Sequence, residues 1–386
     1  MTELLRGTVV AASGAIDDGV VALTGATIAE VGPASTFDSA NLPPPSENIY
    51  VPGMIDVHCH GGGGFGFPDS DLNGARTAAE HHLHRGTTTL LASLVSAAPD
   101  TLIERIETLA PLVDEGTVAG LHLEGPFLAA EVCGAQDPRF IIDGDPELLQ
   151  RLLEAAGGRI ASMTLAAETP HFAELAALLS QHGAVVSVGH TAGDYDTVAA
   201  ALAAVRGRAS ITHLFNGMHP MHHRHPGAVG ASLAAAATGG AVAELIGDGV
   251  HLAAGTVAMV FATVGADQVA FISDAMQAAG MPDGHYRLGP VEVTVASGVA
   301  RLTTPDGAPG AIAGGTASVL DVFVRAVRES GIALADAARA GATTPARLLG
   351  LTDRGSLTAG LRADVLELGP DLSLRTVIRA GSVVSA

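Results

Sequence analysis

Six side chains of the types that bind divalent metals lie at or near the ends of short apolar runs in the middle of the chain. They are His58, His60, Glu124, His190, His213 and Asp274. His58 and His60 are two positions apart, so in a strand both side chains point to the same face. Imidazoles and carboxylates, without a set of thiolates, are typical ligands of catalytic Zn²⁺, Fe²⁺ or Mn²⁺. The pattern predicts a metal centre wherever the fold brings these run ends together.

The elements that must position these side chains alternate between apolar runs and helical patterns. The runs are Gly53–His58, Thr87–Ala92, Val118–Leu123, Met163–Leu165, Val185–Val188, Ile211–Leu214, Ala243–Ile246 and Val269–Ile272, and helical patterns between them include Thr101–Leu112, Pro146–Ala155, Ala173–His182 and Tyr195–Val205. This alternation predicts an α/β fold with a (β/α)8 barrel over residues 53–354, in which chemistry gathers at the C-terminal ends of the strands. A doubly wound open sheet is the alternative, although no GxGxxG motif follows a strand to favour it.

Both ends of the chain have a different sequence pattern, which is typical of β-strands alone. Short runs of β-forming residues separated by Gly and Asp turns occupy residues 1–52, and similar runs occupy residues 355–386. We therefore expect the two termini to combine in one small domain, a β-sandwich beside the barrel.

The composition excludes several classes of chemistry. The chain has 386 residues, with 20 basic and 40 acidic side chains and a formal net charge of −20, which disfavours nucleic-acid and anionic-membrane partners. Every basic residue is Arg, so a Schiff-base lysine, a pyridoxal-phosphate lysine, a Walker A loop and a metal-bridging carboxylated lysine are excluded. The start of the chain lacks a signal-peptide pattern, and its two cysteines, Cys59 and Cys133, cannot form a disulfide scaffold. We expect a cytoplasmic protein with no membrane span.

Several longer motifs resemble the amidohydrolase superfamily. The segment from Pro52 to Gly61, PGMIDVHCHG, resembles its first-strand signature. Further segments resemble one branch, the N-acetylglucosamine-6-phosphate deacetylases: HLEGPF at 122–127, SVGHT at 187–191, THLFNGM at 212–218, DGVH at 248–251 and SDAM at 273–276. The matches keep the family's order and extend to the turn at 313–316, while the terminal β segments fit its small β domain.

The resemblance implies a role for each matching residue. Glu124, His190 and His213 resemble the principal metal ligands, Asp274 resembles the catalytic acid and base that also faces the metal, and His58 and His60 resemble the extra pair of members with two metals. Implied substrate-binding residues are Gly125, Asn216, Gly217, His251 and Arg224, which resembles an arginine reaching the phosphate from a neighbouring subunit. Gln136 stands where some relatives have a substrate-binding histidine. It can donate and accept hydrogen bonds but cannot change charge near neutral pH.

The remaining histidines receive more ordinary interpretations. His81, His82 and His84 share one helical turn beside Arg85, and we expect them on a solvated face. His122 shares a strand face with Glu124, which favours a supporting or packing role. The loop 219–226 holds four histidines between prolines, and we expect it at an interface or around a phosphate.

Together these inferences predict a hydrolase that removes the acetyl group from N-acetylglucosamine 6-phosphate. It would use one or two divalent metals per subunit, Zn²⁺ first and Fe²⁺, Mn²⁺ or Co²⁺ as alternatives, and would form a homodimer. A metal would lower the pKa of water and polarise the amide carbonyl. Two alternatives remain open: another amidohydrolase, such as a dihydroorotase-like enzyme or an N-acyl-amino-acid deacylase, and a catalytically inactive barrel that acts as a binding protein.

Overall fold

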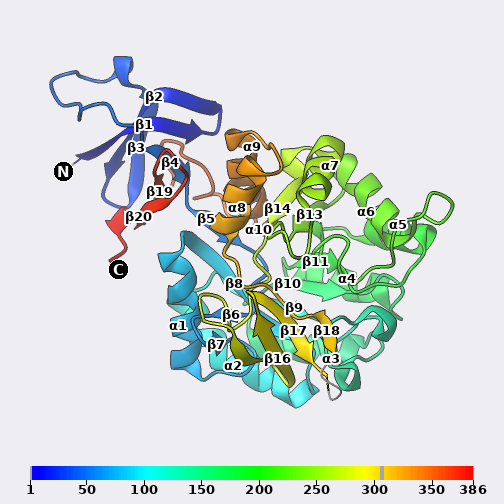
Figure 1. Ribbon diagram of the computed structural model, residues 1–386. Helices are drawn as coiled ribbons and strands as arrows, with labels where there is room; N and C mark the ends of the chain where they lie inside the picture. The colour runs from blue at the N-terminus through cyan, green and yellow to red at the C-terminus, as the bar shows by residue number, and fades with distance from the viewer. Residues whose placement is uncertain (1, 305–307, 386) are drawn as a thin grey trace.

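Eight parallel strands in the middle of the chain form one curved sheet, the barrel of Figure 1. The computed structural model describes residues 2–304 and 308–385. The strands are β5 (Met54–Asp56), β8 (Thr87–Val95), β9 (Gly120–Glu124), β10 (Ile160–Leu165), β11 (Val185–Val188), β12 (Ala209–Ile211), β13 (Val242–Leu245) and β14 (Val269–Phe271), and all neighbours pair in parallel. Just beyond the outermost strands, the Asp274 N–H donates to the His58 carbonyl at 2.9 Å and the His60 N–H donates to the Ala275 carbonyl at 2.7 Å. These bonds join the two edges of the sheet, and the predicted (β/α)8 barrel is confirmed.

One helix follows each barrel strand and covers its outer side. These helices are α1 (Leu72–His84), α2 (Pro99–Asp114), α3 (Pro146–Ala156), α4 (Phe172–Gln181), α5 (Tyr195–Ala204), α6 (Gly227–Ala237), α7 (Ala254–Val264) and α8 (Val319–Arg328); α9 (Leu334–Ala338) and α10 (Thr344–Leu349) follow. In the described parts of the chain, no helix combines the length and apolarity needed to cross a membrane.

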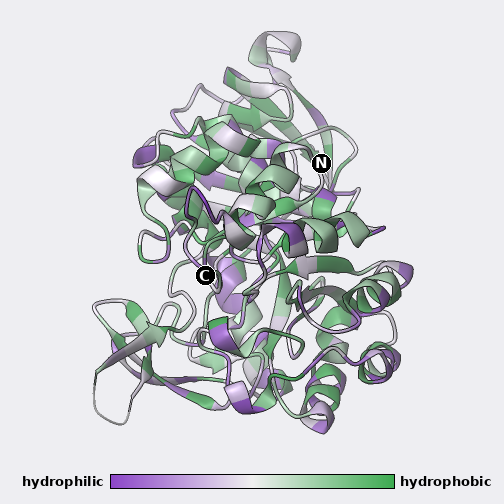
Figure 2. Ribbon diagram, turned by 90° about the vertical axis from the view of Figure 1, so that its right-hand side faces the viewer, coloured by the Kyte–Doolittle hydropathy of each residue, from purple (hydrophilic) through white to green (hydrophobic). Residues whose placement is uncertain are grey.

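Local sequence explains where a helix such as α3 begins and ends. The Asp145 carboxylate accepts hydrogen bonds from the N–H groups of Glu147 and Leu148, and Pro146 occupies the first turn. Gly157, with φ 54°, ends the helix in the left-handed conformation that glycine adopts without steric cost. The buried face of the helix consists of Leu148, Leu149, Leu152, Leu153 and Ala156. Figure 2 shows the same mixture over the molecule, with both apolar and polar stretches on the helices.

The two termini meet in one seven-stranded sheet, in the order β21-β20-β19-β4-β1-β2-β3, and both chain ends lie on this side of the molecule (Figure 1). The strands are β1 (Thr2–Ala11), β2 (Gly14–Thr24), β3 (Thr27–Pro33), β4 (Ile49–Pro52), β19 (Val365–Leu368), β20 (Leu374–Arg379) and β21 (Ser382–Val383). All seven strands fall within residues 1–52 and 355–386. They form a single continuous sheet, whereas a β-sandwich was expected. Only β1 and β4 pair in parallel among these described neighbours.

A small antiparallel sheet between β14 and α8 was not predicted. It consists of β15 (Gly284–Leu288), β16 (Val291–Ala296), β17 (Val299–Thr303) and β18 (Pro309–Ile312), paired in this order. Its apolar residues pack against Val95 and Met276 at the mouth of the barrel. The insertion therefore lies beside the strand ends, where the predicted metal ligands are found.

Candidate metal centre

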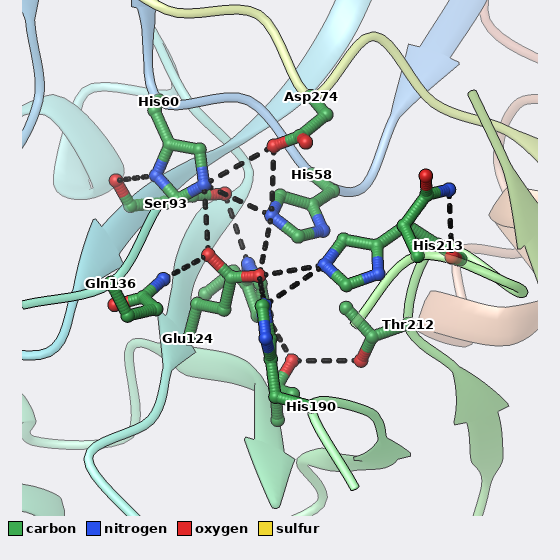
Figure 3. A network of polar contacts seen from close by, with 12 residues as sticks. His58, His60, Ser93, Glu124, Gln136, His190, Thr212, His213 and Asp274 are labelled. Carbon is green, nitrogen blue, oxygen red and sulfur yellow. Dashed lines mark hydrogen bonds and ion pairs between the residues drawn. The ribbon is translucent and has the colours of Figure 1, made fainter. Parts of the chain in front are cut away.

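The Glu124 carboxylate, at the end of β9, lies among four imidazole rings (Figure 3). Its Oε1 atom is 2.9 Å from Nε2 of both His190 and His213, and 3.6 Å from Nε2 of His58. Its Oε2 atom is 3.2 Å from Nε2 of His60. One carboxylate thus lies close to ligand atoms of four histidines, which come from three segments of the barrel, those after β5, β11 and β12.

The six predicted ligands form two adjacent groups. Glu124, His190 and His213 make one group, and His58, His60 and Asp274 make the other; within each group the ligand atoms lie within 4.8 Å of one another. Asp274 Oδ1 is 3.3 Å from Nε2 of His58 and 3.4 Å from Nε2 of His60. The fold therefore brings all six side chains together, as the barrel topology requires.

Three of these residues have unusual backbone conformations. His190, His213 and Asp274 have φ angles of 45°, 29° and 46°, in the left-handed region that residues other than glycine seldom adopt. Each follows a barrel strand, where the chain must turn sharply while its side chain points over the barrel mouth. Such strain persists only where the surroundings impose it, and it is concentrated at functional sites.

The hydrogen bonds of His190 and His60 leave one nitrogen of each ring free to bind a divalent cation. His190 Nδ1 donates to the Val132 carbonyl at 3.0 Å, and His60 Nδ1 donates to the Ser93 carbonyl at 3.2 Å. A neutral imidazole with a proton on Nδ1 presents a lone pair at Nε2, which is the metal-binding form. Nε2 of His190 lies 3.2 Å from Nε2 of His213, and Nε2 of His58 lies 3.0 Å from Nε2 of His60. Lone pairs at such distances repel one another unless a cation or proton lies among them, so the donor set fits one divalent metal in each group.

Electrostatics keep the carboxylates ionised. Burial raises the pKa of Glu124, but the charge of His58 and hydrogen bonds from His190 and His213 outweigh it and hold that pKa well below its usual range. Burial also raises the pKa of Asp274, but the charge of His58 and the hydrogen bond from His60 lower it to about 2. Both groups can therefore act as anionic ligands, and Asp274 can accept a proton.

A cavity of about 230 Å³ opens beside the two groups. Its lining includes five of the predicted ligands, the predicted substrate residues Gln136, Asn216, Gly217 and His251, and Leu288, Ala311 and Ile312 from the β15–β18 sheet. A larger hollow of about 620 Å³ lies between α8 and the terminal sheet, but its lining contains none of the six ligands. Of these two cavities, the smaller one combines room for a small substrate with the metal-binding groups of the described residues.

Gln136 is held against the metal ligands. Its Nε2 atom donates to Glu124 Oε2 at 2.6 Å, and its Oε1 atom accepts from the Ser96 N–H at 2.8 Å. Both ends of the amide are engaged, so Gln136 orients Glu124 as well as lining the cavity.

His251 is oriented by a buried carboxylate. Its Nδ1 atom lies 2.8 Å from Asp248 Oδ2, and Asp248 Oδ1 accepts from the N–H groups of Val250 and His251. Burial lowers the pKa of His251, but the hydrogen bond and charge of Asp248 raise it above its usual value. Because Nδ1 is engaged, Nε2 is the atom that His251 offers to the cavity. Sequence analysis singled out His251 but gave no role to Asp248.

We expect Asp248→Asn to lower the pKa of His251, because the neutral amide removes the attraction that stabilises the imidazolium. Titration of the His251 ring proton by NMR, in metal-free wild type and variant, measures the change. Glu174→Gln removes the carboxylate of the exposed pair His171–Glu174 and serves as the control, with no effect on His251. An unchanged His251 pKa in Asp248→Asn would show that Asp248 does not control its protonation.

The other predicted substrate residues differ in their positions. Asn216 and Gly217 line the cavity, and a Cβ atom on Gly217 would lie 2.7 Å from His190 Nδ1, which explains the glycine. Gly125 is buried behind Glu124 and is not among the described residues that line the cavity. Arg224 is exposed in the loop 219–226 and also lies outside that lining.

One expectation about the remaining histidines was wrong. His82 is fully buried, and its Nε2 atom donates to the Gly61 carbonyl at 2.8 Å and lies 3.2 Å from Cys59 Sγ. The turn of α1 that was expected in solvent instead packs against the glycine-rich segment after β5. His84 is exposed as expected.

A (β/α)8 barrel with paired histidine–carboxylate groups at its strand ends defines a class, the barrel enzymes that carry out metal-assisted hydrolysis. The chain belongs to the amidohydrolase family, whose sequence model matches residues 49–384. The matched residues cover the whole barrel and the strands β4, β19, β20 and β21 of the terminal sheet.

Individual relatives extend this similarity to nearly the full chain. An N-acetylglucosamine-6-phosphate deacetylase of Lysinibacillus sphaericus is 34% identical over 344 residues, covering 88% of this chain and 86% of the relative. An N-acetylgalactosamine-6-phosphate deacetylase of Escherichia coli O157:H7 is 31% identical, and the match covers 100% of both chains. Among solved structures, a mutant N-acetyl-D-glucosamine-6-phosphate deacetylase from Mycobacterium smegmatis in complex with N-acetyl-D-glucosamine-6-phosphate has a TM-score of 0.93 and 36% identity, covering 100% of both chains.

Proposed function

We propose that this protein hydrolyses the acetamide bond of N-acetylglucosamine 6-phosphate and releases acetate and glucosamine 6-phosphate. The observation that carries the proposal is the pair of adjacent metal-ligand groups, with Glu124 of one group close to His58 and His60 of the other and with Asp274 lining a cavity of about 230 Å³. The similarity to relatives that are named for this activity supports the choice of substrate.

We propose two divalent metals per subunit, with Zn²⁺ as the first choice and Fe²⁺, Mn²⁺ and Co²⁺ as alternatives. Glu124, His190 and His213 would hold one ion, and His58, His60 and Asp274 the other. Bound there, a divalent metal lowers the pKa of water and polarises the amide carbonyl.

The protein's own groups would move the protons. The ionised Asp274 takes a proton from the attacking water, whose oxygen forms a bond to the acetyl carbon. As the carbon–nitrogen bond breaks, Asp274 returns that proton to the departing amino nitrogen. His251, fixed at Nδ1 by Asp248, donates from Nε2 to the carbonyl oxygen, where negative charge develops.

A second candidate substrate is N-acetylgalactosamine 6-phosphate, because the relative named for it matches the whole chain. Protein loaded with each metal in turn should be assayed for acetate and free amine. The proposal requires a higher kcat/KM for the glucosamine derivative than for the galactosamine derivative, unphosphorylated N-acetylglucosamine, an N-acyl amino acid or dihydroorotate. Preference for either of the last two would favour another amidohydrolase activity, and no turnover at any metal loading would favour a binding protein.

We also propose that the protein is a homodimer in which Arg224 binds the substrate phosphate of the neighbouring subunit. The loop that carries Arg224 is pinned by two backbone hydrogen bonds between His222 and His225, of 3.2 and 2.9 Å, and it projects Arg224 and Met221 into solvent. Such a short, exposed and pinned loop suits contact with a second subunit.

Arg224→Ala should weaken binding of the phosphorylated substrate by roughly tenfold to a hundredfold, because a charge-assisted contact contributes about 1.5–3 kcal/mol. The unphosphorylated sugar should bind almost unchanged. Arg206→Ala, which removes another exposed arginine, is the matched control.

Mixed dimers test whether Arg224 acts across the interface. Combining Arg224→Ala subunits with Asp274→Asn subunits creates one site with both lesions and one site with neither, so activity should partly return. No recovery in a sample that native mass spectrometry shows to contain mixed dimers would refute this placement.

A further inference from the structure

Glu244 is a buried carboxylate in the middle of strand β13, and no part of the proposed mechanism uses it. Only 3% of the residue is exposed, and its neighbours Ala243 and Leu245 are fully buried. Its Oε1 atom accepts hydrogen bonds from the hydroxyls of Ser210, at 2.8 Å, and Ser187, at 3.4 Å. A buried anion requires partners, and these two hydroxyls satisfy only one of its oxygens.

The other oxygen faces a metal ligand. Among the described residues, neither Glu244 Oε2 nor His58 Nδ1 has a hydrogen-bond partner, although both are buried. The two atoms lie 3.6 Å apart, and the His58 side chain has no exposed surface. Each atom is therefore the natural partner of the other, and a small shift of either side chain completes a hydrogen bond.

The neighbouring ligands show what this contact does. His60 and His190 each donate from Nδ1 to a backbone carbonyl, which leaves Nε2 as the metal-binding atom. His58 has no such carbonyl, and Glu244 takes its place with a negative charge. A carboxylate behind a histidine fixes its tautomer and ring orientation and makes it a stronger ligand.

We propose that Glu244 is the positioning residue for His58 and thereby sets the metal affinity of the His58–His60–Asp274 group. This inference rests on the proposed pair of metals. It implies that carboxylates stabilise the histidine ligands of the two sites in different ways. The Glu124–His190–His213 group has a carboxylate directly between its two histidines, whereas the second group depends on a carboxylate held behind one of its ligands.

Two variants separate charge from orientation. Glu244→Gln keeps an oxygen that can accept from His58 Nδ1 but removes the charge, and Glu244→Leu removes both. Metal-free protein should be titrated with Zn²⁺ against a chelating competitor to obtain the affinity of each site. We expect binding at the second site to weaken by about tenfold to a hundredfold in Glu244→Gln, and further in Glu244→Leu, with the first site unchanged.

Thr164→Val is the matched control, because Thr164 belongs to the same buried polar interior but contacts His122 and Thr212, each at 2.9 Å. It should leave both Zn²⁺ affinities unchanged. The melting temperature of each metal-free variant shows whether the fold is intact, and Glu244→Gln keeps the test valid if Glu244→Leu does not fold.

The outcomes distinguish this inference from the proposed function. Equal weakening at both sites, or wild-type affinities in both Glu244 variants, would overturn the role of Glu244 while leaving the two-metal centre standing. Binding of a single Zn²⁺ by the wild type would overturn the two-metal centre and this inference together.

Discussion

Asp274→Asn is expected to lower kcat by about 10²–10⁴-fold, the usual contribution of a general acid–base group. The Asp274 carboxylate faces both the cavity and the His58–His60 pair. Asparagine keeps the size and one oxygen of the side chain but cannot shuttle a proton. It also tolerates the left-handed backbone, here with φ 46°, better than most residues other than glycine do.

The measurement combines kcat with metal content. The variant should fold, because the backbone bond from Asp274 N–H to the His58 carbonyl is preserved. It should also retain its metals, because asparagine keeps one side-chain oxygen and His58 and His60 are unchanged. Asp196→Asn, at an exposed position of helix α5 outside the lining of the cavity, is a matched replacement and should leave kcat unchanged. Near-wild-type kcat in Asp274→Asn with full metal content would remove Asp274 from the proton transfers.

Much of the barrel could be predicted because parallel strands covered on both faces appear as short apolar runs. All eight predicted runs overlap a barrel strand; Val185–Val188, for example, is β11. The spacing of His58 and His60 and the strand-end positions of Glu124 and Asp274 predicted their meeting, because the C-terminal ends of barrel strands form one rim.

What sequence analysis missed depends on contacts between distant segments. The β15–β18 sheet was overlooked although Val291, Val293 and Val295 alternate in the manner of a strand, because an insertion has no place in the βα repeat. His82 is buried because it packs against the segment after β5. The sequence of its own helical turn gives no sign of that contact.

Glu244 did leave a signal in the sequence. It is the single acid in the apolar run Ala243–Ile246, and a charge inside a buried strand calls for a partner. The partner is His58, which follows β5, whereas Glu244 lies on β13. The two residues are far apart in sequence and come together only because the sheet closes into a barrel. The engaged amide of Gln136 is hidden for the same reason, since it depends on the Ser96 N–H from another strand end.

Glu124→Gln is expected to remove at least one metal and to lower kcat by about 10³-fold or more, since metal binding supplies several kcal/mol of transition-state stabilisation. The orientation of the new amide follows from its neighbours. Gln136 Nε2 donates to the Oε2 position at 2.6 Å, so that position must keep an acceptor oxygen. The amide nitrogen then occupies the Oε1 position, 2.9 Å from Nε2 of both His190 and His213.

The amide nitrogen has no lone pair available to a metal, because that pair is delocalised into the carbonyl group. The Glu124–His190–His213 group should therefore lose its ion first. Elemental analysis should show the content falling from two ions per chain to one or fewer, and Glu147→Gln, an exposed site on α3, should change neither metal content nor kcat. Gln136→Leu combined with Glu124→Gln removes the donor that fixes the amide, which frees the amide to turn its oxygen toward His190 and His213. Partial recovery of the lost metal in the double variant would establish that Gln136 dictates the orientation, whereas full metal content in Glu124→Gln alone would show that Glu124 is not a metal ligand.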